Sequence, residues 1–404
     1  MASPGTPIAE QTAASERIVA VVVTYNRLTL LPQTLAGIAA GSLTPDLVVI
    51  VNNASTDGTT DYLDQLSYEL QTDVVHLNTN VGGAGGFAVG IDRALARHAA
   101  DLVWVMDDDT EPTENTLAEA YRAWLDYSPV RSERPVLVAS KVSWSDGRDH
   151  PMNTMRTMFG AGKKRTDRAA RVGARPIRSA SFVSILMDGA AMRATELPLA
   201  EFFIWNDDFE YTTRLAHHGN AIATERSVAL HHTKTFGTTD AKPGPRFYND
   251  VRNKLWVLCG RRTLSPFEKL LYGGATARLW ASTLLRTDEK KTYTGYFLHG
   301  VKDAVRGYRS TAEVLRGVYD LETTQVAHKT RLTMGNGQEF SLLMSIYAKD
   351  KAEQLREALT SNTRGQTLAP DQVVLVEDGP LPADLTAVLD EFEAAATMPV
   401  TRLK

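Results

Sequence analysis

Three consecutive carboxylates, Asp107, Asp108 and Asp109, directly follow a short apolar run from Leu102 to Met106. Like charges this close repel one another, so such a cluster is costly unless a cation neutralises it. Carboxylate ligands suit Mg²⁺ or Mn²⁺, and a diphosphate that shares the metal becomes a better leaving group. The alternative is a solvated acidic turn, a common use of aspartate, and the triplet alone does not decide between the two.

A second acidic group, Asp207, Asp208 and Glu210, follows an aromatic segment that ends at Trp205. A carboxylate held near an acceptor hydroxyl can remove its proton as a general base. The aromatic side chains would pack the carboxylates against an apolar wall and could form a platform for a sugar ring. Acids are equally common in the first turn of a helix, where they interact favourably with its dipole.

Two adjacent histidines, His231 and His232, follow the strand-like run Val228–Leu230. A neutral imidazole at this point can complete a metal site, and we assign that role to His232. A packed or surface role is the more common use of a single histidine. The assignment therefore depends on the aspartates.

Four glycines lie in the turn from Asn80 to Phe87. Glycine lets the backbone approach a ligand closely, and the N-terminus of the helix that follows favours phosphate. The segment Gly83–Ala88 also satisfies the G-x-G-x-x-A pattern of dinucleotide-binding proteins. Four further residues, Asn78–Val81, and another glycine separate that pattern from the preceding strand, and a ribose contact needs one carboxylate rather than three. We therefore favour a phosphate-binding turn over a dehydrogenase.

From residue 17 the sequence alternates between β-branched apolar runs and segments with apolar residues at helical spacing. We expect strands at Ile18–Val23, Leu47–Val51, Val74–Leu77 and Leu102–Met106. Such alternation builds a doubly wound, mainly parallel α/β sheet whose ligands bind at the carboxyl ends of its strands. The polar residues expected on that rim are Thr24–Arg27, Asn52-Asn53, Asn80–Gly83 and Asp107–Asp109.

From about residue 340 the opening pattern returns. A strand at Phe340–Ile346 leads to Tyr347, a helix follows, and a strand at Val373–Val376 leads to Glu377-Asp378-Gly379. The order and spacing match those of residues 18–58, as expected for the start of a second copy. No second aspartate cluster follows, so this unit should be catalytically inert.

These patterns divide the chain into four parts. We expect a disordered leader at residues 1–16, a catalytic α/β domain at 17–260, a helical extension at 261–335 and an incomplete second α/β unit at 336–404.

The bulk composition excludes some classes of partner. Lys and Arg total 44 against 48 Asp and Glu, and the formal net charge of −4 gives no reason to expect a nucleic acid. The single cysteine, Cys259, cannot form an intrachain disulfide, and the first sixteen residues lack the apolar stretch of a signal peptide. We expect a cytoplasmic protein.

The helical region 262–310 carries several cations beside apolar residues, among them Lys269, Arg278 and Arg286. Such a region could lie on an anionic membrane surface, which here would be the inner face of the plasma membrane. Packing against the catalytic domain, or against a partner subunit in a homo-oligomer, is the more common use of an amphipathic helix and is the favoured alternative.

Four of these segments together resemble the GT-A family-2 glycosyltransferases: Val22–Arg27, Asn52–Thr59, Asn80–Phe87 and Asp107–Asp109. The block Phe202–Tyr211 and His232 extend the resemblance, which covers about residues 17–260. Within the family the chain is most similar to galactofuranosyltransferases of cell-wall galactan and to related rhamnosyltransferases. The resemblance implies a GT-A fold, a nucleotide-sugar donor, Mn²⁺ or Mg²⁺ as cofactor, inversion at the anomeric carbon, and a lipid-linked cell-surface glycan as acceptor.

The resemblance also implies a role for each site residue. Asp208 would be the catalytic base, and Asp107, Asp109 and His232 the metal ligands. Trp205, Asp207 and Glu210 would contact the acceptor. The donor would be bound by Thr24, Tyr25, Arg27, Asn52, Asn53, Asp57, Asn80, Gly82, Gly83, Asp107 and Asp108.

The chain departs from the family at one point. Many members carry an aspartate where this chain has Asn52 or Asn53. An amide oxygen can accept the same hydrogen bond from a uracil or thymine N3–H, so base binding survives the exchange. We favour UDP-galactofuranose as donor, with dTDP-rhamnose as the alternative. A non-catalytic sugar-nucleotide-binding scaffold is a further alternative, although a binder has no need of Asp208.

Overall fold

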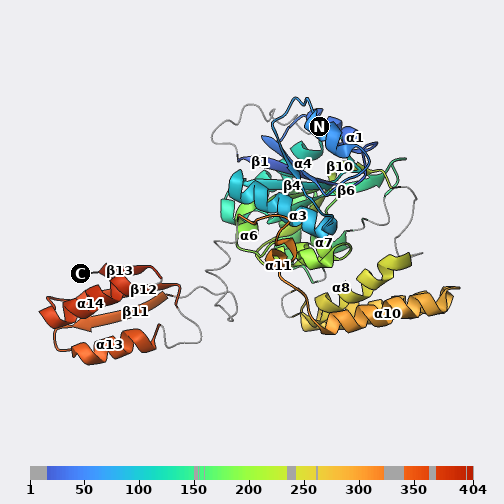
Figure 1. Cartoon of the computed structure of the whole chain (residues 1–404). Helices are drawn as coiled ribbons and strands as arrows, with labels where there is room; N and C mark the ends of the chain where they lie inside the picture. The colour runs from blue at the N-terminus through green and yellow to red at the C-terminus, as the bar shows by residue number, and fades with distance from the viewer. Residues whose placement is uncertain are drawn as a thin grey trace. The chain divides into compact units, whose positions relative to one another are not determined.

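The computed structural model describes residues 16–149, 153, 155–158, 160–233, 243–260, 263–322, 341–363, 370–396 and 398–403 of the 404-residue chain (Figure 1). The chain forms two compact units, Met1–Thr323 and Thr324–Lys404. The predicted leader, except for Glu16, lies outside the described residues, as does the predicted boundary near residue 335.

The strand β1 (Ile18–Thr24) is buried along its whole length. Its sequence is apolar at every position but the last, which is typical of a strand covered on both faces. Alternate side chains of a strand point to opposite faces, and accordingly Val21 and Val22 belong to two different hydrophobic cores. The strand pairs in parallel with β2 and β4, and β2 pairs in parallel with β3. These three neighbours are β2 (Leu47–Asn52), β3 (Thr72–His76) and β4 (Leu102–Asp107).

The large sheet has the order β3-β2-β1-β4-β9-β6-β10-β8-β7, with β5 paired to β10. The parallel group β3-β2-β1-β4 confirms the α/β expectation, since its strands alternate with helices along the chain. The strand β9 runs antiparallel between β4 and β6. The remaining strands are β5 (Thr110–Pro112), β6 (Leu137–Trp144), β7 (Arg156–Thr157), β8 (Ala174–Ser179), β9 (Ile185–Asp188) and β10 (Ala221–His231).

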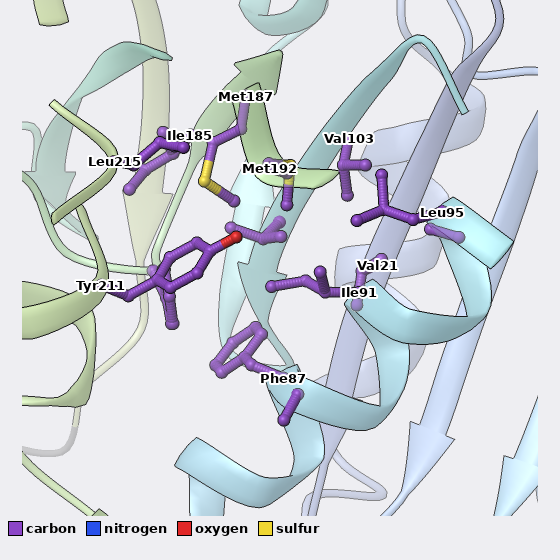
Figure 2. Packing of buried hydrophobic residues seen from close by; sticks show 14 of the residues in the cluster. Val21, Phe87, Ile91, Leu95, Val103, Ile185, Met187, Met192, Tyr211 and Leu215 are labelled. Carbon is purple, nitrogen blue, oxygen red and sulfur yellow. The ribbon is translucent and has the colours of Figure 1, made fainter. Parts of the chain in front are cut away.

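Helices cover both faces of this sheet. One core contains residues of α1 and α4, and the other contains residues of α3 and α7. Figure 2 shows the second core, where Phe87 and Ile91 of α3 lie beside Val21, with Tyr211 of α7 nearby. A π-helical turn, Arg93–Arg97, continues α3. The helices are α1 (Leu31–Ala39), α2 (Thr59–Asp64), α3 (Gly82–Asp92), α4 (Thr116–Asp126), α5 (Lys163–Arg171), α6 (Gly189–Arg193) and α7 (Asp207–Leu215), with 3₁₀ turns at Arg131–Glu133, Ala200–Phe202 and Gly244–Arg246.

A helical extension follows the sheet. Its helices are α8 (Phe247–Cys259), α9 (Pro266–Arg286), α10 (Lys290–Val305) and α11 (Thr311–Leu315). The helices α8 and α10 lie side by side (Figure 1). Val251 of α8, Trp280 of α9 and Tyr293 of α10 share a small core. A capping box between Ser265 and Glu268 begins α9. In the described part of the chain, every helix is too short or too polar to cross a bilayer.

The second unit contains a three-stranded parallel sheet with the order β11-β12-β13. This order repeats that of β1-β2-β3, and Tyr347 pairs with Asp378 at the end of the strands much as Thr24 pairs with Asn52. The apolar residues Ile346 and Leu375 lie in its core. Its elements are β11 (Ser341–Tyr347), α13 (Ala352–Ser361), β12 (Gln372–Asp378), α14 (Ala383–Ala395) and β13 (Val400–Leu403).

Candidate active site

A cavity of about 1350 Å³ lies at the carboxyl ends of β1 and β4. This volume exceeds the roughly 300–1,000 Å³ of a typical small-molecule site, so it has room for two substrates. The polar rim predicted for the parallel sheet is therefore a real cavity wall. The predicted site residues that line it are Tyr25, Arg27, Asn53, Asn80, Gly82, Gly83, Asp107, Asp108, Asp109, Trp205, Asp207 and Asp208.

Asp107, Asp109 and His231 form a group of side chains that could hold a metal ion. One ligand atom from each lies within 4.8 Å of the others. The His231 Nε2 is 3.0 Å from Asp109 Oδ1, and its Nδ1 is 2.8 Å from the amide oxygen of Asn153. An imidazole that donates one N–H to an acceptor has its tautomer and orientation fixed, which leaves the other nitrogen for a metal. Two carboxylates and an imidazole suit a divalent cation such as Mn²⁺.

The structure places His231, and not the predicted His232, in this group. His232 lies with its Nε2 2.7 Å from Glu111 Oε2, and it does not line the cavity. His231 is the last residue of β10, and successive side chains along an extended chain point in opposite directions. The side chain that faces Asp109 is therefore that of His231.

The pKa values of the three carboxyl groups in this cluster are shifted in different directions. Burial, followed by the charges of its two neighbours, raises the pKa of Asp107 well above its usual range. Burial and the Asp109 charge raise the pKa of Asp108 to about 7, although the backbone N–H of Tyr25 donates to it at 3.0 Å. Burial also acts on Asp109, but the hydrogen bond with His231 and the nearby Arg27 outweigh it, and its pKa is lowered. The cluster therefore attracts protons or a cation.

Asp207 and Asp208 form the first turn of α7 and line the same cavity. Burial and the neighbouring Asp208 charge raise the pKa of Asp207 to about 8. Burial also raises the pKa of Asp208, partly offset by the backbone N–H of Phe209, which donates to Oδ1 at 2.6 Å, and by Arg156. A carboxylate with a raised pKa is a stronger base near neutral pH, which suits proton removal from an alcohol.

The loop before α7 holds an unusual backbone conformation. Phe203, Trp205 and Asn206 have φ values of 63°, 70° and 65°, in the left-handed region that non-glycine residues rarely adopt. Asn253 of α8 stabilises this loop, because its amide donates to the carbonyl oxygens of Ile204 and Trp205 at 3.0 and 2.8 Å. Strain of this kind persists only where the surroundings hold it, and it clusters at functional sites. No sequence motif marks Asn253, so sequence reasoning missed it.

The glycine turn contacts the same loop. Gly82 has a φ of 75°, and a Cβ placed there would lie 2.1 Å from the carbonyl oxygen of Phe203. The Asn80 side chain accepts a hydrogen bond from the Gly82 N–H at 2.8 Å, and Asn53 accepts one from the Val81 N–H at 2.9 Å. Glycine at position 82 therefore permits both the turn and the close approach of Phe203.

The remaining glycines of the turn do not form a dinucleotide-binding loop. Gly85 and Gly86 lie inside α3, where a Cβ would approach Val81 and Val23 to 2.6 and 2.5 Å. Gly86 allows the helix to pack closely on β1, and Gly85 leaves room for the side chain of Val81. The match to the G-x-G-x-x-A pattern thus has a packing explanation.

Two residues predicted to bind the donor, Asn52 and Asp57, do not line the cavity. The amide of Asn52 donates to Thr60 at 2.8 Å, and its oxygen accepts from the Ser55 N–H at 3.1 Å. Asp57 accepts from the backbone N–H of Leu28 at 3.1 Å. Both residues make hydrogen bonds within the loops that follow β1 and β2.

Thr24 and Glu210 also lie away from the cavity surface. Thr24 is fully buried beneath Asp108 and helps to hold down the pKa of that carboxyl. Glu210 is buried and pairs with Arg214, with the guanidinium nitrogens 2.9 and 3.0 Å from the carboxylate. It lies two positions after Asp208 on α7, and residues two apart on a helix do not share a face, so Glu210 faces Arg214 instead. The prediction that Glu210 contacts the acceptor is therefore not supported by its position.

Residues 19–169 match the family model described as glycosyl transferase family 2. The chain contains a family-2 glycosyltransferase domain. Galactofuranosyltransferase GlfT1 of Mycolicibacterium smegmatis is 25% identical over 278 residues, which cover 64% of this chain and 89% of that protein. The GlfT1 of Mycobacterium tuberculosis is 26% identical over 297 residues, 68% of this chain and 92% of that protein.

A solved structure supports the fold. TarS of S. aureus superposes with a TM-score of 0.50 at 16% identity, over 78% of this chain and 53% of that longer chain. The GT-A fold and the enzyme class are thus established, and the chain is a glycosyltransferase. A short match, 43% identical over 54 residues, links it to an Escherichia coli UDP-Gal:alpha-D-GlcNAc-diphosphoundecaprenol beta-1,3-galactosyltransferase and covers 13% of this chain and 19% of that enzyme.

Proposed function

We propose that this enzyme transfers galactofuranose from UDP-galactofuranose to a lipid-linked cell-surface glycan, with inversion at the anomeric carbon and with a divalent metal ion. The observation that carries the proposal is the shared cavity of Asp109, His231 and Asp208. The similarity to two galactofuranosyltransferases over about nine tenths of their length supports the donor sugar.

On the donor side, Asp107, Asp109 and His231 would hold the cation. A bound Mn²⁺ or Mg²⁺ would offset the charge that develops on the leaving diphosphate. Arg27 lies 3.5 Å from Asp109 Oδ2, where its guanidinium can bind phosphate oxygens once the cation has engaged the carboxylate. The N-terminus of α3, which begins at Gly82, adds backbone N–H groups that favour phosphate.

On the acceptor side, Asp208 would remove the proton from the attacking hydroxyl group. Asp207, with its pKa near 8, would keep its own proton at neutral pH and could donate a hydrogen bond to the sugar. Trp205 lies on the cavity wall and offers a face for a sugar ring. Attack from the side opposite the leaving diphosphate inverts the anomeric carbon.

The lipid-linked acceptor has separate support. The E. coli enzyme that matches over 54 residues acts, by its name, on a diphosphoundecaprenol-linked sugar. In this chain α9 exposes the large apolar side chains of Phe267, Leu270, Leu271 and Leu285. These side chains are suited to peripheral contact with a membrane that carries such an acceptor.

The decisive test is donor turnover by the purified full chain. We expect UDP release from UDP-galactofuranose with Mn²⁺, and loss of that activity in EDTA that is reversed by added Mn²⁺. UDP-galactopyranose and dTDP-rhamnose serve as competing donors in the same assay. Activity that is indifferent to chelation would contradict the metal dependence. Faster turnover of dTDP-rhamnose would contradict the donor sugar but leave the enzyme class unchanged.

A further inference from the structure

Arg156 on β7 lies in the wall of the catalytic cavity. The centre of its guanidinium is 5.1 Å from the ring centroid of Tyr272 on α9 and 5.5 Å from that of Phe209 on α7. Both distances fall within the range of cation–π contact. Two helices thus hold one arginine head group in place through the faces of their aromatic residues.

Arg156 differs from Arg27 and Lys254 of this cavity in its electrostatic partners, and it shares its stacking on aromatic rings with Arg246, whose guanidinium is 5.8 Å from the Trp205 ring. Arg27 lies 3.5 Å from Asp109, and Lys254 lies 2.8 Å from Asp250. Within the described part of the chain, Arg156 makes no ion pair with a carboxylate at 4.0 Å or less. An arginine that stacks on rings keeps the edge of its planar guanidinium available for a bidentate contact with an oxyanion.

The position of Arg156 puts it on the acceptor side. It lies close enough to Asp208, the proposed base, to lower the pKa of that carboxyl. The metal-binding group contains Asp107, Asp109 and His231, and the donor diphosphate would be neutralised there. A second cation beside the base has no role in that neutralisation and is available to the acceptor.

The cavity wall around Arg156 is strongly apolar on the side of α9. Ala275 and Leu279 of α9 line it, together with Leu258 of α8 and Leu264, which precedes α9; Thr276 is a polar residue of α9 in the same lining. A fixed cation beside an apolar wall matches an amphiphile with an anionic head and a hydrocarbon chain. It does not match a neutral oligosaccharide, whose hydroxyl groups would lose their hydrogen bonds against such a wall.

We propose that Arg156 is a specificity-determining residue that binds a phosphoryl group of the acceptor, with the attached hydrocarbon chain along the α9 wall. This inference rests on the proposed function, since it concerns the acceptor of that same site. It goes further by naming the residue and the chemical group that it recognises.

Calorimetric titration of the full chain, saturated with UDP and Mn²⁺, tests the proposal. The filled donor site prevents the probe from binding to the metal. The probes are hexyl phosphate, hexyl β-glucoside and inorganic phosphate. We expect hexyl phosphate to bind more tightly than either other probe, because only this probe combines the oxyanion with the hydrocarbon chain.

The variants are Arg156→Gln, Arg156→Lys and the control Arg148→Gln. We expect Arg156→Gln to weaken hexyl phosphate binding about tenfold or more, in line with the loss of a charge-assisted pair. The affinity of Arg156→Lys for hexyl phosphate should be intermediate, because lysine keeps the positive charge but cannot make the bidentate contact of a guanidinium. Arg148 is a matched control, since it also stacks on an aromatic ring, that of Trp144 at 5.3 Å, but does not line the cavity.

Three results would overturn the inference. If wild type and Arg156→Gln bound hexyl phosphate with equal affinity, Arg156 would not contact the acceptor phosphoryl group. A loss of UDP affinity in Arg156→Gln would assign the residue to the donor. If inorganic phosphate bound as tightly as hexyl phosphate, the apolar wall would not contribute to binding of the hydrocarbon chain. If the wild type itself failed to bind UDP with Mn²⁺, the proposed function would fail instead, so the two failures are distinguishable.

Discussion

His231 Nε2 lies 3.0 Å from Asp109 Oδ1, although 122 residues separate them in the chain. The contact follows from strand pairing, because β10 runs antiparallel to β5 and places His231 opposite Thr110, the residue after Asp109. The metal-binding group is therefore assembled by the sheet itself. The end of β4 supplies Asp107, and β10 supplies the imidazole.

Replacement of His231 by alanine should weaken Mn²⁺ binding by at least tenfold, because it removes one of three ligands. His232→Ala is the matched control, since His232 lies beside Glu111 and outside the cavity. Its Mn²⁺ affinity should stay within about twofold of wild type. Electron paramagnetic resonance of free Mn²⁺ during titration measures both. A larger loss in His232→Ala than in His231→Ala would reverse the assignment of the two histidines.

Replacement of Asp208 by asparagine should lower the transfer rate by about 10²–10⁴, the usual contribution of a general base. The UDP affinity in Mn²⁺ should stay close to wild type, because Asp208 lies on the acceptor side. Steady-state transfer and UDP calorimetry separate the two effects.

Asp207→Asn is the comparison for this variant, because Asp207 lies next to Asp208 on the same helix turn. It should raise the acceptor KM more than it lowers kcat. If the transfer rate stayed near wild type in Asp208→Asn and was lost in Asp207→Asn, then Asp207 rather than Asp208 would be the base.

Local sequence patterns were sufficient to predict the parallel half of the fold. The run of β1 is apolar and β-branched at nearly every position, and only a strand buried on both faces combines these features. Polar residues at the ends of such strands share one sheet edge, so the positions of Tyr25, Asn80 and Asp107 in one cavity could be foreseen.

The choice between His231 and His232 could not be made from sequence. It depends on the register of β10 against β5, which is set by pairing across more than a hundred residues. The predicted acceptor contact of Glu210 failed to appear for a related reason, since an acid in the first turn of a helix can face either the ligand or the core. Its partner Arg214 lies one helical turn later, which is the available signal for a buried pair.

Arg156 and Asn253 had no sequence signal at all. Their roles arise from tertiary contacts with Tyr272 and with the carbonyl oxygens before α7. No spacing rule connects β7 with α9, or α8 with the loop that ends at Trp205.

The stability of the metal-free protein should fall as the pH rises from 5 to 8. The folded-state pKa values of Asp108 and Asp207 are raised to about 7 and about 8. A carboxyl whose pKa is raised by folding contributes stability that is complete below its unfolded pKa, near 4, and that is lost as the pH passes the folded value. Thermal unfolding in EDTA across this range measures the trend.

Mn²⁺ should raise the melting temperature more at pH 8 than at pH 5.5, because the cation replaces the protons of the cluster. In EDTA the melting temperature of Asp207→Asn should fall less steeply with pH than that of wild type, since the variant lacks one of the titrating groups. A wild-type melting temperature that rises between pH 5 and 8 in EDTA would contradict the raised pKa values.

Gly82→Ala should destabilise the enzyme by about 2 kcal/mol or more, because the new Cβ meets the Phe203 carbonyl and the backbone has a positive φ. Donor affinity should fall with it. The control is Gly83→Ala, where a Cβ meets nothing within 4 Å and the residue lies in α3. That variant should keep its wild-type melting temperature. Equal melting temperatures for the two variants would contradict the close contact with Phe203.

The most direct test of the metal-dependent mechanism is anomalous diffraction from a crystal of the full chain grown with UDP and Mn²⁺. We predict one manganese peak in the cavity, within about 2.5 Å of carboxylate oxygens of Asp107 or Asp109 and of the His231 Nε2, with the UDP diphosphate on its open side. A bound UDP with no manganese peak at these residues would contradict the account.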